Sequence, residues 1–138
     1  MTMDPERLFL LSGGERYSPA VDEWFAERSG ELSSIGKRWF EVMRAAGDDV
    51  VDLLHDDHPT ACIGEAAFGY VNVFKAHVNV GFFRGAELED PDGILEGSGR
   101  FMRHVKRRPG LHEGDDALER LIEIAYADMR RRLAAGQG

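Results

Sequence analysis

The chain has 138 residues, of which 43% are hydrophobic and 30% charged, which is enough for one domain with its own core and excludes a wholly disordered chain. Its formal net charge of −8 argues against a nucleic-acid-binding protein, because phosphate contacts need clustered Lys and Arg side chains. No apolar run approaches the roughly 20 residues that cross a bilayer, so we expect no membrane partner. The single cysteine, Cys62, cannot form an internal disulfide, which favours a cytoplasmic location.

Two segments are expected along the chain: an N-terminal arm with a short helix over residues 1–31, and an α/β domain over residues 32–135. Ser18 followed by proline supplies a cap and a first-turn proline, which predict a helix over residues 19–28. A second helix is predicted over residues 32–46, because the apolar side chains there fall on one stripe.

The acidic segment over residues 48–58 is predicted to contain a short helix, with Asp48, Asp52, His55 and Asp56 on one side of it and with Asp57 and His58 in the loop that leaves it. Its apolar residues have helical spacing, and Pro59 forces the residue before it out of the helical region, so the helix should end there. Carboxylates together with imidazole suit iron or another divalent ion. We therefore take Asp52, His55 and Asp56 as the candidate metal ligands.

The most strongly patterned stretch consists of two alternating runs, residues 67–74 and 77–83, joined by only two residues. Such a short connection predicts a tight antiparallel hairpin in which Phe74 lies opposite His77. One face of this hairpin is then wholly apolar and must face the core. The other face carries Tyr70, Asn72, Phe74, His77, Asn79, Gly81 and Phe83.

The remaining elements complete a small sheet between helices. A short strand is predicted over residues 60–63, a short helix at residues 94–96, a basic strand over residues 100–106 and a long helix from Asp115 onward. The fold class is therefore α+β, with an antiparallel sheet of four or five strands packed against N- and C-terminal helices.

The run GYVNVFKAHVNVGFF, followed by GAELEDPDGILEGSGRFMRHVK, resembles the YdhG-like family, which carries domain of unknown function 1801. The resemblance covers roughly residues 32–133. It implies an α/β domain whose small sheet is packed by terminal helices, in the manner of secretion-chaperone-like folds. Some relatives are described as frataxin-like iron chaperones, so iron is the alternative to the expected absence of a cofactor. The resemblance implies no shared activity.

We expect the polar face of the hairpin to bind a small polar or anionic ligand or a partner segment, because amides and imidazole form hydrogen bonds while aromatic rings stack. The basic strand beside it would add contacts to an anion. The candidate ligand-binding residues are Tyr70, Asn72, Phe74, His77, Asn79, Arg100, Arg103 and His104.

Three alternatives stay open: a solvated face or one covered by residues 8–11, a metal carrier, and an enzyme with His77 or His104 as its base. No nucleophile motif is present, so binding is favoured over catalysis and no catalytic residue is predicted. The pattern also leaves open whether the chain forms a homodimer.

Overall fold

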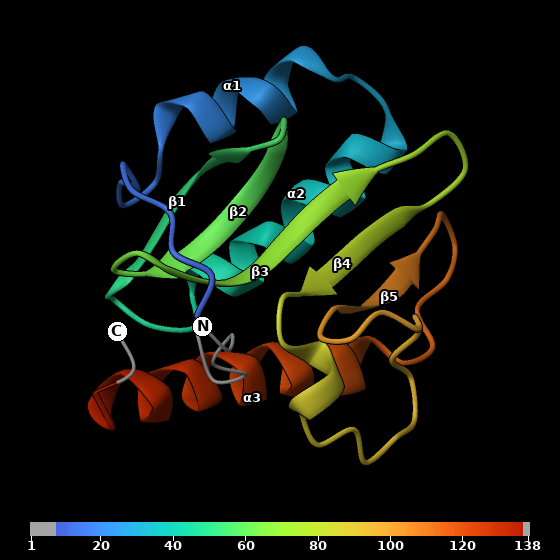
Figure 1. Cartoon of the computed structure of the whole chain (residues 1–138). Coiled ribbons are helices and arrows are strands. Elements are labelled where there is room, and N and C mark those ends of the chain that lie inside the picture. The colour runs from blue at the N-terminus through green and yellow to red at the C-terminus, as the bar shows by residue number, and fades with distance from the viewer. Residues whose placement is uncertain (1–7, 137–138) are drawn as a thin grey trace.

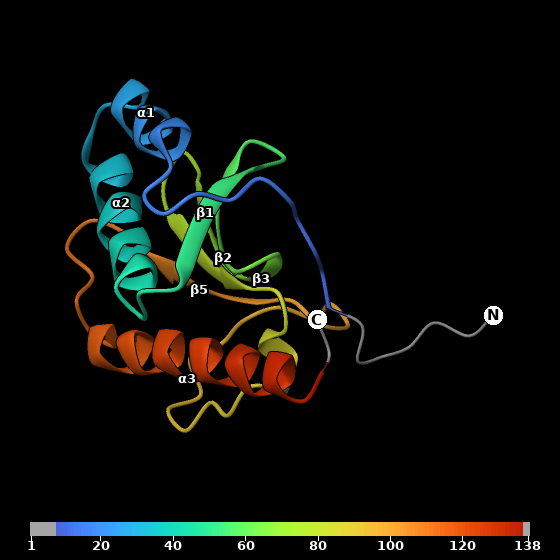
Figure 2. The ribbon, with the colours of Figure 1, turned by 90° about the vertical axis from the view of Figure 1, so that its left-hand side faces the viewer.

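A five-stranded antiparallel sheet with three helices packed against one of its faces makes up the protein (Figure 1). The computed structural model describes residues 8–136. The α+β fold predicted from the sequence is confirmed, with two helices before the sheet and one after it. In Figure 2 the two N-terminal helices lie to the left of the strands and the C-terminal helix below them, while the N-terminal arm passes to the right.

The strands follow one another across the sheet in chain order, so each strand is hydrogen-bonded to its neighbours in sequence. This meander needs only short connections, since every pair is antiparallel. The strands are β1 (Val50–His55), β2 (His58–Ile63), β3 (Ala66–Val73), β4 (Val78–Phe82) and β5 (Arg103–Arg107).

Both N-terminal helices and the C-terminal helix form where the sequence predicted them. They are α1 (Pro19–Glu27), α2 (Glu31–Arg44) and α3 (Asp115–Ala134). The helix expected at residues 94–96 is wrong: the carboxylate of Asp90 accepts the N–H groups of Ile94 and Leu95, but no helix continues from this turn. A single 3-10 turn, η1 (Gly85–Glu87), forms upstream instead.

The register predicted for the β3–β4 hairpin is confirmed. Asn72 lies opposite Asn79 and Tyr70 opposite Gly81, while the N–H of Phe74 donates to the carbonyl of His77 over 2.8 Å. The apolar face of the hairpin meets the helices and is fully buried at most of its positions. Its buried members are Val71, Val78, Val80 and Phe82.

The helix predicted over residues 48–58 is wrong, because this segment forms β1 and the start of β2. Asp56 and Asp57 make the two-residue turn between them, with φ of 49° and 61°. Non-glycine residues rarely adopt this left-handed conformation, although aspartate tolerates it better than most. Apolar side chains occur on both faces of β1, since helices cover one face and Gly14 of the arm lies against Val51 on the other. Because both faces are covered, the apolar residues of β1 do not alternate with polar ones, and their spacing resembles that of a helix.

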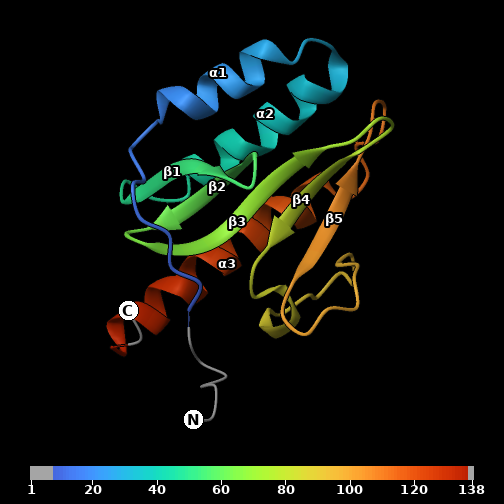
Figure 3. The same cartoon turned by 45° about the horizontal axis from the view of Figure 1, so that its top comes forward.

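The described part of the N-terminal arm, from residue 8 onward, crosses the face of the sheet away from the helices, which we call the outer face (Figure 3). The N–H of Leu11 donates to the carbonyl of Glu65, and the N–H of Ala67 donates to the carbonyl of Phe9, at 2.7 and 3.0 Å. Farther along, Glu15 pairs with Asp52 on the free edge of β1. The arm therefore runs from the first residues of β3 to the free edge of β1.

The hydrophobic core lies between the sheet and the helices, and residues from the arm and α1 belong to it. Leu8, Val21, Trp24 and Phe25, all before residue 32, pack in the same cluster as α2 and α3. The outer face is different: among residues 8–136, no helix covers it.

Candidate functional site

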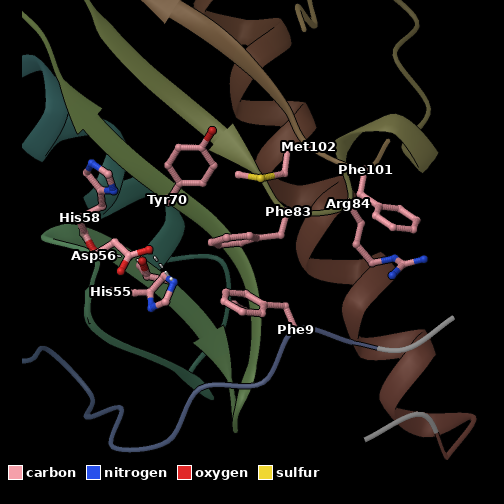
Figure 4. Close-up of a pocket in the computed structure, with 11 residues that line it drawn as sticks. Phe9, His55, Asp56, His58, Tyr70, Phe83, Arg84, Phe101 and Met102 are labelled. Atoms are coloured by element: carbon pink, nitrogen blue, oxygen red, sulfur yellow. Dashed lines mark hydrogen bonds and ion pairs between the residues drawn. The ribbon is translucent and has the colours of Figure 1, made fainter. Parts of the chain in front are cut away.

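The outer face of the sheet contains a hollow of about 370 Å³, which we call the outer-face pocket (Figure 4). Its aromatic lining comes from four separate segments of the chain: the arm, β3, the residue after β4 and the loop before β5. The aromatic side chains are Phe9, Tyr70, Phe83 and Phe101. In Figure 4, His55, Asp56 and His58 lie at one end of the pocket, and Arg84 lies at the other end.

Three of the rings form a continuous arc together with an imidazole. The ring centroids of Tyr70 and Phe83 lie 5.2 Å apart, and those of Phe83 and Phe9 also 5.2 Å apart. Phe9 meets the imidazole of His55 edge to face at 5.1 Å. These separations are those of favourable aromatic pairs, so the arc holds its own shape.

Tyr70 is held flat on the sheet because its neighbour on β4 is a glycine. A Cβ atom at Gly81 would lie 2.0 Å from Cζ of Tyr70, so the ring occupies the space that a side chain there would fill. One face of the ring is therefore turned to the backbone. Burial raises the pKa of the Tyr70 phenol, which keeps the hydroxyl protonated at neutral pH.

The turn between β1 and β2 aims its two carboxylates in different directions. Asp57 turns toward α1, where it accepts hydrogen bonds from Nε1 of Trp24 and from Arg28, both at 3.1 Å. Asp56 turns toward the pocket, with its Oδ2 atom 3.3 Å from Nε2 of His55. The side chain of Asp56 is 82% exposed, so its charge is available to a ligand.

Arg84 brings a cation to the other end of the pocket, but that cation is already paired. Its Nη2 atom forms an ion pair with Glu87, and its guanidinium lies 5.0 Å from the ring centroid of Phe101. Glu87 also accepts from Arg132, which in turn pairs with Asp128. Arg131 also pairs with Asp128, so the network joins three arginines through two carboxylates, and Glu87 is the direct partner of Arg84.

Of the eight ligand-binding residues predicted from the sequence, only Tyr70 lines the pocket. Asn72 and Asn79 form the next row on the outer face, and Oδ1 of Asn79 is buried without a hydrogen-bond partner. Phe74 and His77 stack on each other at 4.7 Å beside the β3–β4 turn. These residues share a face with Tyr70 but not its pocket.

The basic residues predicted to assist binding have other surroundings. His104 lies opposite Gly81 in the sheet, so it shares the outer face without lining the pocket. Arg103 donates to the carbonyls of Gly99 and Met102, and the guanidinium of Arg100 lies 5.1 Å from the ring centroid of Phe101.

The three predicted metal ligands do not come together. Asp52 points into the core, fully buried, and forms an ion pair with Arg44 over 2.7 Å, while His55 and Asp56 lie at the pocket. The interpretation of this segment as a helix placed them on one side; in the strand, alternate residues face opposite sides of the sheet. Within residues 8–136, no three His, Cys, Asp or Glu side chains form a group that could hold a metal ion.

Sequence reasoning missed Phe9 and Phe101 as site residues. Phe9 belongs to an apolar run in the arm whose packing position no periodicity indicates, and Phe101 was one of several alternating residues in the basic strand. His58 was assigned to an exit loop because Pro59 follows it. Only tertiary structure brings these residues to Tyr70 and Phe83.

Comparisons with family models, curated proteins and solved structures found no match to this chain. The resemblance to the YdhG-like family therefore stays a prediction. In the part of the chain that the structure describes, no helix is both long and apolar enough to cross a membrane.

Proposed function

We propose that this protein is a binding domain for a small organic molecule and that the outer-face pocket is its binding site. The observation that carries this proposal is the convergence of four aromatic side chains from four separate segments around one hollow. Its volume of about 370 Å³ falls within the range of small-molecule sites. Membership of the YdhG-like family and a cytoplasmic location remain part of the proposal.

Folding alone does not account for the aromatic arc. The sheet already buries its apolar face against the helices, and the outer face could be polar throughout. Instead, Phe9 stays 42% exposed while it contacts Phe83 and His55. Large apolar side chains gathered around an exposed hollow are typical of a site that a ligand covers.

Binding is favoured over catalysis by the state of the hydroxyl groups in the pocket. Thr60 donates its hydroxyl to the carbonyl of His58 at 3.0 Å, and burial keeps the phenol of Tyr70 protonated. Among the residues that the structure describes, neither group is paired with a base that would activate it.

The test compares two phenylalanines of the outer face, Phe9 in the pocket wall and Phe74 outside it. Their exposed fractions are 42% and 43%, so each change to alanine removes a similar amount of exposed ring. A fragment set of amines, carboxylates and neutral aromatics would be screened by thermal shift, because ligands that bind the native state raise the midpoint.

We expect at least one fragment to bind, Phe9→Ala to weaken its binding at least threefold and Phe74→Ala to leave it unchanged. Backbone amide signals in the NMR spectrum should shift near Tyr70 and Phe83. A screen without hits, or equal losses in both variants, would refute the proposal.

A further inference from the structure

We infer that the outer-face pocket selects an organic cation, such as an alkylated ammonium group, over an anion. This inference rests on the proposed function and names the ligand class of the same site. It differs from the polar or anionic ligand that the sequence indicated, and the reason is the distribution of fixed charge around the pocket.

The aromatic arc supplies the first part of the argument. The face of an aromatic ring carries partial negative charge and attracts cations within about 6 Å of its centroid. Because one face of Tyr70 covers Gly81, the opposite face is the one a ligand in the pocket would meet. Phe83 and Phe9 continue the arc at 5.2 Å spacings, so a cation in the hollow can contact several rings at once.

Asp56 supplies the second part. Its carboxylate is the acidic group that lines the pocket; its Oδ2 atom lies 3.3 Å from Nε2 of His55, and the side chain is 82% exposed. The turn holds this aspartate in a left-handed conformation that aspartate tolerates better than most residues, and it places the carboxylate at the rim of the pocket.

The cations that could attract an anion do not offset this arrangement. Arg84 is paired directly with Glu87, whose second carboxylate oxygen accepts from Arg132. Arg100 and Arg103, which the sequence indicated for an anionic ligand, do not line the pocket. With Arg84 paired to Glu87, the fixed charge left among the lining side chains is the carboxylate of Asp56, and the whole chain carries a net charge of −8.

The experiment uses choline, its neutral analogue 3,3-dimethylbutan-1-ol, and benzoate, each titrated into the full chain by NMR and calorimetry. Choline and the alcohol have nearly the same shape and differ by one charge. We expect choline to shift the amide signals of Tyr70 and Phe83 and to bind at least tenfold more tightly than the alcohol, and benzoate to bind weakest.

Two aspartates in one turn provide a matched pair of variants. Asp56→Asn removes the carboxylate at the pocket and should weaken choline binding about fivefold, as expected for an exposed ion pair. Asp57→Asn changes the net charge equally, yet its side chain faces Trp24 and Arg28, so choline affinity should stay the same. Asparagine suits the left-handed conformation, so both variants should keep the turn.

Two variants of Tyr70 distinguish the electrostatic attraction of its ring from the burial of apolar surface. Tyr70→Phe keeps the ring and should preserve choline binding, whereas Tyr70→Leu should lose it about tenfold while the alcohol loses less than threefold. Circular dichroism would verify that each variant is folded.

The outcomes distinguish this inference from the proposed function. If benzoate or the alcohol binds as tightly as choline at Tyr70 and Phe83, selection for a cation is wrong and the pocket remains a ligand site. If these probes and the wider fragment screen all fail to shift those signals, both proposals are wrong.

Discussion

Replacement of Asp52 by asparagine should destabilise the protein strongly, because Asp52 is the fully buried partner of a buried arginine. Its carboxylate accepts from Nε and Nη2 of Arg44 at 3.2 and 2.7 Å and from the backbone N–H of Ser18 at 3.1 Å. Arg44 is only 2% exposed, and these pairs raise the pKa of its guanidinium against the opposing effect of burial. The variant would leave the arginine charged inside the core.

The expected cost is about 3 kcal/mol, the lower end of the range for breaking a buried pair, because Arg44 keeps Asp22 and Glu41 as partners. An unfolding entropy of about 2.1 cal/mol/K per residue over 138 residues converts this to a fall of about 10 °C in Tm. Urea denaturation followed by circular dichroism measures the free energy of unfolding, and the slope m should not change.

Asp22→Asn is the matched control, since it removes the half-exposed partner of the same arginine and should cost at most about 1 kcal/mol. The double variant Arg44→Met with Asp52→Leu removes both buried charges and should be more stable than Asp52→Asn alone. A loss below about 1 kcal/mol for Asp52→Asn, or a double variant less stable than the single one, would refute the reasoning.

Three further predictions concern separate parts of the molecule. Gly81→Ala should displace the Tyr70 ring, lowering stability by about 1–3 kcal/mol and abolishing ligand binding in the same titrations. Burial alone would raise the pKa of Asp49, but hydrogen bonds from Tyr126 and an arginine outweigh it and hold the pKa below its ordinary 3.8. The ionised Asp49 therefore contributes its full stabilisation above pH 3.8, and this contribution is lost as the pH falls through the lower pKa of the folded state. Because Tyr126→Phe removes one of the hydrogen bonds, the stability of this variant should depend less steeply on pH below pH 4. Burial raises the pKa of Cys62 to about 12, so iodoacetamide should modify it at neutral pH only after denaturation in urea, as mass spectrometry would detect.

The β3–β4 hairpin could be predicted in full because its information is local. Alternation assigns each side chain to a face, and a two-residue connection permits only one register, so the pairing of Asn72 with Asn79 follows from counting. The positions of α1 and α2 were predictable for the same reason, since a first-turn proline and a periodic stripe are local signals. Their ends were less so: α2 ends at Arg44, two residues before the predicted end, and Ser18 forms no side-chain capping hydrogen bond.

The errors occurred where long-range contacts decide the structure. β1 carries apolar residues on both faces because the arm covers one of them, and no local pattern indicates that covering. Asp52 was predicted to be a metal ligand, but its carboxylate lies in the core and pairs with Arg44, which the packing of α2 on β1 brings to it. The outer-face pocket depends on the same kind of contact, since Phe9 precedes Tyr70 in the chain and Phe101 follows it, each by about 30 residues or more.

Because Phe9 lies in the arm, ligand binding in the pocket can be measured by the hydrogen exchange of nearby backbone amides. The arm is attached beside Phe9 by two hydrogen bonds, from the N–H of Leu11 to Glu65 and from the N–H of Ala67 to Phe9 itself. A ligand that contacts Phe9 adds its binding free energy to the attachment of the arm, so the two N–H groups must exchange with deuterium more slowly as the ligand concentration rises. Hydrogen exchange at these two amides would then report the affinity of the pocket without any label on the ligand.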